Sequence, residues 1–319
     1  MFMRFNKRVL FKAIKSNLKL FSIGFFMGSA DLVPGVSGGT IAFAFGIYQK
    51  LLSGIKQVTG NFPRLLLQRK FRQAWQVIPF AFFLPLGLGI LSAILLLTNL
   101  IKFLLTNHTE SVWGFFFGLV VASIFLVIRK ITNWQLWNFL ALVAACILTF
   151  WLVGVTPSQT PHDPLWFFAS GAVAICAMIL PGISGSYILL ILGKYNQVIE
   201  AIITKDLVSL SFFGLGIIFG LAMFVRVLSF LLKNYFNLTV SVLIGIMIGS
   251  LRKIWPWKEV LLTTTDSRGE IVVLVERNIL PNIADTSVFT VIVLMFSGFV
   301  LMLLLSRLDK QQSCAPEVS

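Results

Sequence analysis

Long apolar runs separated by short polar stretches fill the chain, and this pattern predicts an all-α polytopic membrane protein. A helix needs about 20 mostly apolar residues to cross a bilayer core. Two apolar segments, at about 18–55 and 166–201, are each broken near the middle by Pro-Gly, and we expect a re-entrant helical hairpin at each. The remaining runs predict transmembrane helices at about 77–101, 112–128, 136–155, 208–232, 238–255 and 285–306.

The two broken segments are copies of one motif. Residues 32–39 return at residues 179–186, and both copies read Pro-Gly-x-Ser-Gly. Later runs also match, for example at Gly118 and Gly245, and the first half has a longer loop at about 56–76. Each half therefore holds one hairpin and three spans. The expected repeats are 1–158 and 159–319, which together form one membrane domain.

Flanking charge indicates the orientation of the hairpins. Basic residues cluster at 4–19 and 50–72 on both sides of the first hairpin, so both of its ends are expected in the cytoplasm. Three spans then place the second hairpin at the opposite face. This gives two inverted-topology repeats in the bacterial inner membrane, with both termini cytoplasmic, a plan common in secondary transporters. Arg252 and Lys253 fall outside as an exception to the charge rule, and they mirror residues 129–130.

The composition excludes several classes of protein. Hydrophobic residues make up 57% of the 319 and charged residues only 12%, with a mean hydropathy of +0.92, so a soluble domain is excluded. The excess of 26 Lys and Arg over 12 Asp and Glu is expected to face anionic membrane lipids rather than nucleic acid. The three cysteines and two histidines stand apart, so we expect no metal site and no cofactor. The apolar stretch at 18–27 looks like a signal peptide, but its recurrence makes it part of the fold.

The two hairpin tips carry the candidate binding chemistry. Glycines let a ligand approach the main chain, and the first N–H groups of a helix lack internal partners and carry partial positive charge. Two such helix starts meeting inside the protein would form an anion site near the midplane. A tight packing joint between small residues is the alternative, and we favour the binding site. The candidate ligands are Ser37, Gly38, Gly39, Thr40, Ser184, Gly185 and Ser186.

Two charges lie inside predicted membrane segments, where charge is costly and functional by default. Arg226, whose repeat partner is Asn99, has the geometry to hold a phosphate by a two-point contact. Asp31 is a candidate to bind a coupling proton or sodium ion, or to cap the start of a helix. A structural Asp31–Arg226 ion pair is the alternative. Pro34 and Pro181 are expected to break the two hairpins.

The sequence does not favour an enzyme. It has no phosphate-binding Gly-x-x-x-x-Gly-Lys loop, and neither Ser37 nor Ser184 has a histidine nearby to act as a base. Tyr48 and Tyr195, which follow the hairpin tips, are expected to be anchors at the membrane interface.

Residues 27–43, which contain the first Pro-Gly-x-Ser-Gly, resemble a motif of the bacterial and archaeal DUF368 membrane family. Residues 178–192 resemble that family's second copy, and the likeness runs from about 18 to 306. The resemblance implies a transporter that returns undecaprenyl phosphate, a polyprenyl phosphate, from the outer to the cytoplasmic leaflet for cell-envelope glycan synthesis. Gln49 and Asn196 depart from the family pattern, in which an acid often follows each Gly-x-Tyr. The motif residues that it implies are Asp31, Pro34, Ser37, Gly38, Gly39, Thr40, Pro181, Gly182, Ser184, Gly185 and Ser186.

Three other functions fit the same motifs. A transporter or channel for a small soluble anion would use the same helix starts, and a closed water-filled vestibule would favour it over a lipid carrier with a lateral opening. A structural scaffold would tolerate Ser37→Ala and Arg226→Ala with full activity. A membrane lipid phosphatase, the weakest alternative, would release free phosphate.

Overall fold

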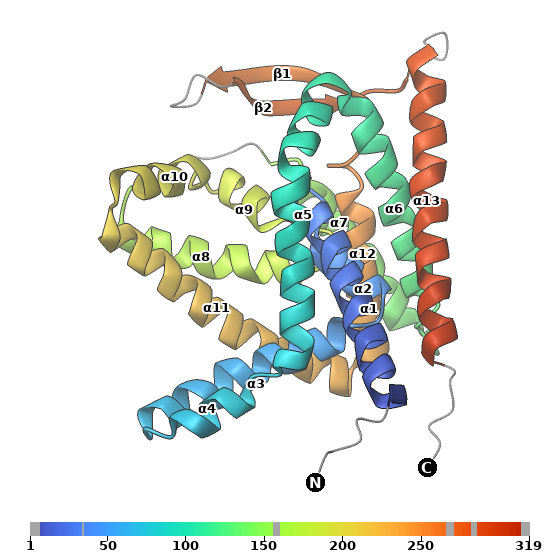
Figure 1. The fold of residues 1–319 in the computed structure, drawn as a ribbon. Helices are drawn as coiled ribbons and strands as arrows, with labels where there is room; N and C mark the ends of the chain where they lie inside the picture. Colours follow the sequence, from blue (N-terminus) through green and yellow to red (C-terminus); the bar gives the residue numbers. More distant parts are fainter. Residues whose placement is uncertain (1–6, 34, 156–159, 266–270, 282–285, 314–319) are drawn as a thin grey trace.

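The computed structural model describes residues 7–33, 35–155, 160–265, 271–281 and 286–313, and Pro34 lies outside these ranges. Helices and one pair of strands form the described chain (Figure 1). In the first half the helices are α1 (Lys7–Asp31), α2 (Gly38–Ala44), α3 (Tyr48–Leu67), α4 (Phe71–Val77), α5 (Phe80–Asn107), α6 (Thr109–Ile128) and α7 (Leu136–Leu152). In the second half the elements are α8 (Pro164–Ile179), α9 (Gly185–Ile191), α10 (Tyr195–Thr204), α11 (Leu207–Asn234), α12 (Phe236–Ser250), β1 (Lys258–Thr265), β2 (Ile271–Asn278) and α13 (Thr286–Ser313).

Each predicted span coincides with a helix. Among the described helices, α5, α6, α11 and α13 are long and apolar enough to cross a membrane, and the bent pair α9–α10 is a fifth if it counts as one span. Helices α7 and α12 are shorter, with 17 and 15 residues. The expectation of an all-α polytopic membrane protein is therefore confirmed, with one small β-hairpin added.

The segment at 56–76, expected as a loop, is helical instead. Helix α3 continues to Leu67, and α4 follows after a short turn. Charged and polar side chains along α3 alternate with apolar ones at helical spacing, so one face can pack against α11 while the other stays polar. The extra residues of the first half thus extend a helix rather than a loop.

The hairpins have a second break, which the hydropathy pattern does not show. Each return arm is a seven-residue helix, α2 or α9, followed by a longer helix that leaves in another direction. The turns lie at Gly46 and Gly193, whose φ angles of 74° and 65° favour glycine. Helices α9 and α10 meet at a bend of 99°. The first arm α1 is also longer than the predicted arm of about 15 residues, since it begins at Lys7.

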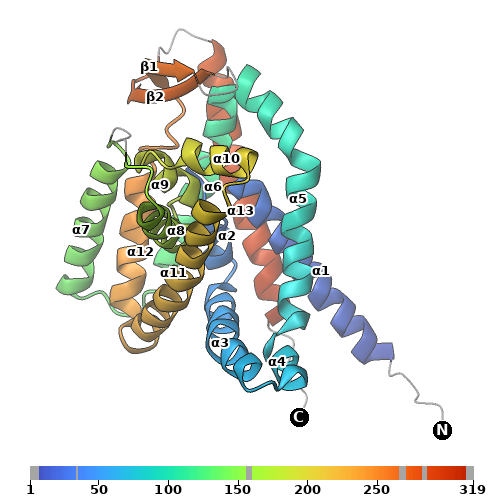
Figure 2. The same ribbon diagram turned by 90° about the vertical axis from the view of Figure 1, so that its left-hand side faces the viewer.

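Corresponding helices of the two halves make corresponding contacts (Figure 2). Helix α1 packs along α5 as α8 packs along α11, and α6 packs along α13 as α12 packs along α7. The third span of each half therefore lies against the second span of the other half. Glycines allow these helices to approach closely: a Cβ on Gly89 would lie 2.1 Å from the carbonyl oxygen of Phe21, and one on Gly216 would lie 2.0 Å from that of Phe168.

The chain ends and the β-hairpin mark opposite ends of the molecule (Figure 1). Both ends of the described chain lie at the end where α3 and α4 project, and the antiparallel β1–β2 pair covers the other end. Helix α10 lies nearer the β-hairpin than α3 does, which is the arrangement expected for hairpins that enter from opposite faces.

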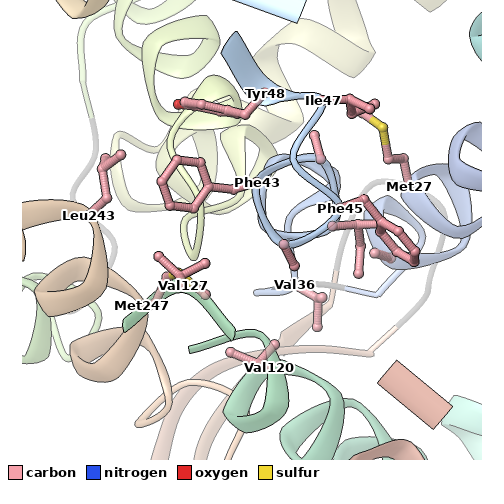
Figure 3. Packing of buried hydrophobic residues seen from close by; sticks show 14 of the residues in the cluster. Met27, Val36, Phe43, Phe45, Ile47, Tyr48, Val120, Val127, Leu243 and Met247 are labelled. Atoms are coloured by element: carbon pink, nitrogen blue, oxygen red, sulfur yellow. The ribbon is translucent and has the colours of Figure 1, made fainter. Parts of the chain in front are cut away.

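The first hairpin forms the centre of the core. Figure 3 shows Val36, Phe43 and Tyr48 packed among side chains of α6 and α12, including Val127 and Met247. Each of these five side chains is almost fully buried. The core therefore fixes the position of the first tip against the two helices that belong to different halves.

Candidate functional site

The two hairpin tips meet inside the helix bundle. The Gly182 N–H donates to Thr40 Oγ1 at 2.9 Å, and the Tyr48 hydroxyl donates to the Ile179 carbonyl at 3.1 Å. The Ser37 hydroxyl is within hydrogen-bond distance of the Leu180 carbonyl, at 3.3 Å. The first hairpin thus binds the backbone of the second directly through side-chain hydroxyls.

The start of α2 in the first tip already has internal partners. The Gly38 N–H donates to Asp31 Oδ1 at 2.7 Å, and the Gly39 N–H donates to Ser37 Oγ at 3.1 Å. A Cβ on Gly39 would lie 2.8 Å from the Ile179 carbonyl oxygen, so glycine permits the close contact between the tips. Asp31 therefore caps α2, one of the two roles expected of it, and the first tip has the geometry of a packing joint.

The second tip keeps polar groups in reach of a ligand. The Ser184 and Ser186 hydroxyls are 2.7 Å apart, and Ser186 is exposed. Ser184 precedes α9 without a side-chain cap on its N–H groups. Gly185 is buried, and a Cβ there would lie 2.8 Å from the Ala174 carbonyl oxygen, so this position requires glycine. As ligands of a substrate, Ser184 and Ser186 stay predictions that this geometry permits.

The structure places Arg226 and Asn99 away from the tips. The Arg226 guanidinium donates to the carbonyls of Ala222 and Thr59, at 2.6 and 3.2 Å, and the side chain is exposed between α11 and α3. Asn99 is exposed on α5. Arg226 and Asp31 have different partners, so the alternative of a structural ion pair between them is wrong.

Lys253, which stands out in the sequence only as an exception to the charge rule, lies against the place where the two tips meet. Its Cγ lies 2.9 Å from the position of a Cβ on Gly35, whose φ is +86°. Its Nζ lies 4.9 Å from the ring centre of Tyr187 in α9. In the first half, Nζ of Lys130 donates to the Phe43 carbonyl of α2 at 2.6 Å. Each half therefore carries a lysine that contacts the short helix of its own hairpin, a match that the repeat predicts.

The β-hairpin completes a charged cluster at Lys253. Glu276 Oε2 accepts from the Nζ atoms of Lys258, at 2.8 Å, and Lys253, at 3.3 Å. Burial lowers the pKa of Lys258 to about 8, although Glu276 opposes the shift. Burial alone would raise the pKa of Glu276, but the two lysines outweigh it and the net pKa is lowered. The carboxylate and both ammonium groups therefore form a charged network over the tip junction at neutral pH.

Tyr48 corrects one expectation about the hairpin ends. Its side chain is 1% exposed, and its hydroxyl donates to the second tip, so it is a buried link between hairpins and not an interface anchor. Tyr195, its counterpart, is 40% exposed. A glycine turn precedes both tyrosines, so the difference lies in what packs on them: the Tyr48 ring lies against Phe43 in the core, which hydropathy alone could not show.

An apolar cavity of about 400 Å³ lies between α1, α5, α6 and α13. Its walls are almost wholly hydrocarbon and aromatic, and a volume of this size is typical of ligand pockets. Ser29 of α1, two residues before Asp31, is one of its few polar lining groups. The lining includes Phe25, Phe26, Ile101, Phe116 and Leu294.

Replacing Thr40 with valine is expected to lower the free energy of unfolding by about 1–3 kcal/mol, because the buried Gly182 N–H would lose its acceptor. Denaturant unfolding in detergent measures this. Thr98→Val is the matched control, since Thr98 is exposed and bonds to Ile94 within its own helix. Equal destabilisation by both variants would show that the Thr40 hydroxyl does not join the tips.

Comparison with known proteins places the chain beside transporters of polyprenyl phosphates. Residues 27–272 match the model of the VCA0040-like family, described as undecaprenyl phosphate translocase-like. A protein of Vibrio cholerae named polyprenyl-phosphate transporter is 42% identical over 258 residues, which cover 81% of this chain and 84% of that protein. A Staphylococcus aureus protein of the same name is 32% identical over 254 residues, covering 73% and 84%. No solved structure matches.

Proposed function

Because the chain belongs to the undecaprenyl phosphate translocase-like family, we propose that it transports undecaprenyl phosphate from the outer to the cytoplasmic leaflet of the bacterial inner membrane. It is a multi-pass membrane protein with apolar helices long enough to cross a bilayer. Returning the lipid carrier would supply it again for cell-envelope glycan synthesis. The resemblance seen in residues 27–43 is confirmed by the family match.

The observation that carries the proposal is the meeting of the two hairpin tips beside Lys253. A phosphate head group needs hydrogen-bond donors and positive charge to leave water. The aliphatic stem of Lys253 lies against Gly35 and its ammonium group lies over the Tyr187 ring, while the Ser184 and Ser186 hydroxyls are possible donors at the start of the same helix α9. The long prenyl tail can stay in hydrocarbon, and the apolar cavity between α1, α5, α6 and α13 offers it a surface.

The proposed orientation has both termini in the cytoplasm. Both ends of the described chain lie at the same end of the molecule, beside α3 and α4, whose side chains include most of the basic residues at 50–72 (Figure 1). Cytoplasmic segments of membrane proteins carry an excess of Lys and Arg. The β-hairpin would then face the outside, where the lipid is collected. Asp31 is our candidate to bind a coupling proton or sodium ion at the first tip.

Transport without hydrolysis is part of the proposal. Residues 35–39 read Gly-x-Ser-x-Gly, a spacing also found in nucleophile elbows of hydrolases. Here Ser37 is buried, its oxygen accepts from the Gly39 N–H, and its hydroxyl lies against the Leu180 carbonyl. Within the described residues the Ser37 hydroxyl contacts backbone groups, and a backbone carbonyl is not the general base that a nucleophilic serine needs.

Leaflet exchange in reconstituted liposomes tests the function. A fluorescent polyprenyl phosphate is placed in both leaflets, and an impermeant quencher destroys the outer signal. Active protein should expose the inner label to the quencher over time, with and without a proton gradient, and release no free phosphate. A fluorescent phosphatidylethanolamine is the control cargo. Folded protein that moves neither lipid under any gradient, or moves both equally, would contradict the proposal.

A further inference from the structure

Lys253, Lys258 and Glu276 form a compact group where the base of the β-hairpin meets the end of α12. Both lysines contact the same carboxylate oxygen of Glu276, at 3.3 and 2.8 Å. The Nζ of Lys258 also donates to the Lys253 carbonyl at 2.6 Å, and its side chain is only 9% exposed. The ammonium groups of Lys253 and Lys258 therefore converge on one oxygen, Glu276 Oε2, and all three side chains are largely buried.

The charges of this group do not balance. Two lysines and one glutamate leave an excess of one positive charge in a place where burial already lowers the pKa of Lys258 to about 8. Arg252, next to Lys253 in sequence, is a further cation and does not offset this excess; its guanidinium donates to the Phe150 carbonyl and lies over the Phe150 ring. A phosphate carries more negative charge than a carboxylate and offers three oxygens to such donors.

We propose that Glu276 occupies the binding site of a phosphate head group, and that a polyprenyl phosphate arriving at this end of the protein displaces it from Lys253 and Lys258. This inference rests on the proposed function and adds the place where the head group first binds. The carboxylate is an internal substitute for the phosphate, since both are oxyanions that accept charge-assisted hydrogen bonds. Displacement moves only the Glu276 side chain, because β2 stays paired with β1, and it gives the two ammonium groups a partner with more negative charge.

The surroundings favour a lipid over a free anion. Lys258 Nζ lies 4.4 Å from the ring centre of Trp113. Trp255 and Trp257, which precede Lys258 in sequence, pack edge to face against each other. Tryptophan collects at the head-group level of membranes, where one side of the ring meets hydrocarbon and the other meets water. The site is also continuous with the tips, because the Lys253 stem lies against Gly35. A head group bound here would stand next to the tip junction.

Equilibrium binding to the full-length protein in nanodiscs tests the site. The probes are farnesyl phosphate, inorganic phosphate and farnesol, each at neutral pH. Glu276→Gln is expected to bind farnesyl phosphate about five- to tenfold more tightly than the wild type, because the competing carboxylate is gone. Lys258→Gln is expected to bind it about tenfold more weakly. Tighter binding cannot arise from misfolding, so Glu276→Gln remains decisive even if the lysine variant is unstable.

The same hairpin supplies the control. Glu259 and Arg277 form an exposed ion pair at 2.7 Å, and Glu259→Gln should leave the affinity for farnesyl phosphate unchanged. Unchanged or weaker binding by Glu276→Gln would overturn the site, as would equal effects of both glutamate variants. Inorganic phosphate that binds as tightly as farnesyl phosphate would overturn the lipid assignment, and farnesol that binds equally would overturn head-group recognition. Head-group binding in protein that exchanges no lipid would refute the proposed transport and leave the phosphate site standing.

Discussion

Replacing Lys253 with methionine is expected to slow exchange of a polyprenyl phosphate between leaflets by about ten- to a hundredfold. Methionine keeps the aliphatic stem that packs on Gly35 but removes the charge over Tyr187. A hydrogen bond to a charged group contributes about 1.5–3 kcal/mol, and about 1.4 kcal/mol corresponds to a tenfold change in rate. Glu276 retains Lys258 as a partner, so the β-hairpin should stay in place. The initial rate of label quenching in liposomes measures the effect.

Arg226→Met is the matched comparison for Lys253. It removes one positive charge from an exposed side chain that bonds to the Ala222 and Thr59 carbonyls. We expect it to lower the exchange rate less than threefold, as an exposed polar contact contributes little. If Arg226→Met abolishes exchange while Lys253→Met does not, the head group passes along α11 and α3 rather than over the tips. The two variants therefore decide whether the head group is bound by Arg226, the cation predicted from sequence, or by Lys253, the cation that the structure places beside the tips.

Hydropathy and internal repetition were sufficient to predict the membrane helices. The Pro-Gly-x-Ser-Gly copies located both tips, and the matched glycines of later spans predicted the internal repeat, whose halves make corresponding contacts at α1–α5 and α8–α11. These features are local or periodic, so each can be recognised in one segment of sequence. The sequence also predicts that the tips meet inside the protein, because the backbone groups at a break within the membrane need partners.

The position of Lys253 in the fold could not be predicted in the same way. A charge in the middle of an apolar run is conspicuous, as at Arg226, whereas Lys253 lies at the very end of the predicted span 238–255 and reads as a flanking residue. Its role depends on the β-hairpin, whose Glu276 is far from it in sequence but adjacent in space. A usable signal was present, because Lys253 breaks the charge rule and is mirrored by Lys130. Both lysines contact the short helix of their own hairpin, so the exception reflects repeat symmetry, and for Lys253 it falls at the place where we propose that the head group binds.

The close helix contacts make a second prediction with a large effect, on stability. Gly89→Ala and Gly216→Ala should each lower the free energy of unfolding by about 3 kcal/mol and the thermal midpoint by about 5–10 °C. A Cβ on Gly89 or Gly216 would lie 2.1 or 2.0 Å from a carbonyl oxygen of the neighbouring helix, so the helices must separate. The contacted atoms belong to the backbone of the neighbouring helix, which cannot move aside as a flexible side chain can. Separating the two helices would expose apolar surface along their whole contact. Intrinsic fluorescence during heating in detergent gives the midpoint.

The same two helices contain the controls for this prediction. Gly87 and Gly214 are two residues earlier on α5 and α11, and a Cβ on either has nothing within 4 Å. Alanine is the better helix former by about 0.5–1 kcal/mol, so Gly87→Ala and Gly214→Ala should leave the midpoint unchanged or raise it slightly. Equal losses at Gly87 and Gly89 would mean that helix flexibility, not close packing, explains the glycines. A lower midpoint for Gly89→Ala and Gly216→Ala, with an unchanged or higher midpoint for Gly87→Ala and Gly214→Ala, would show that both halves rely on the same helix contact. The α5 pair and the α11 pair are repeat counterparts.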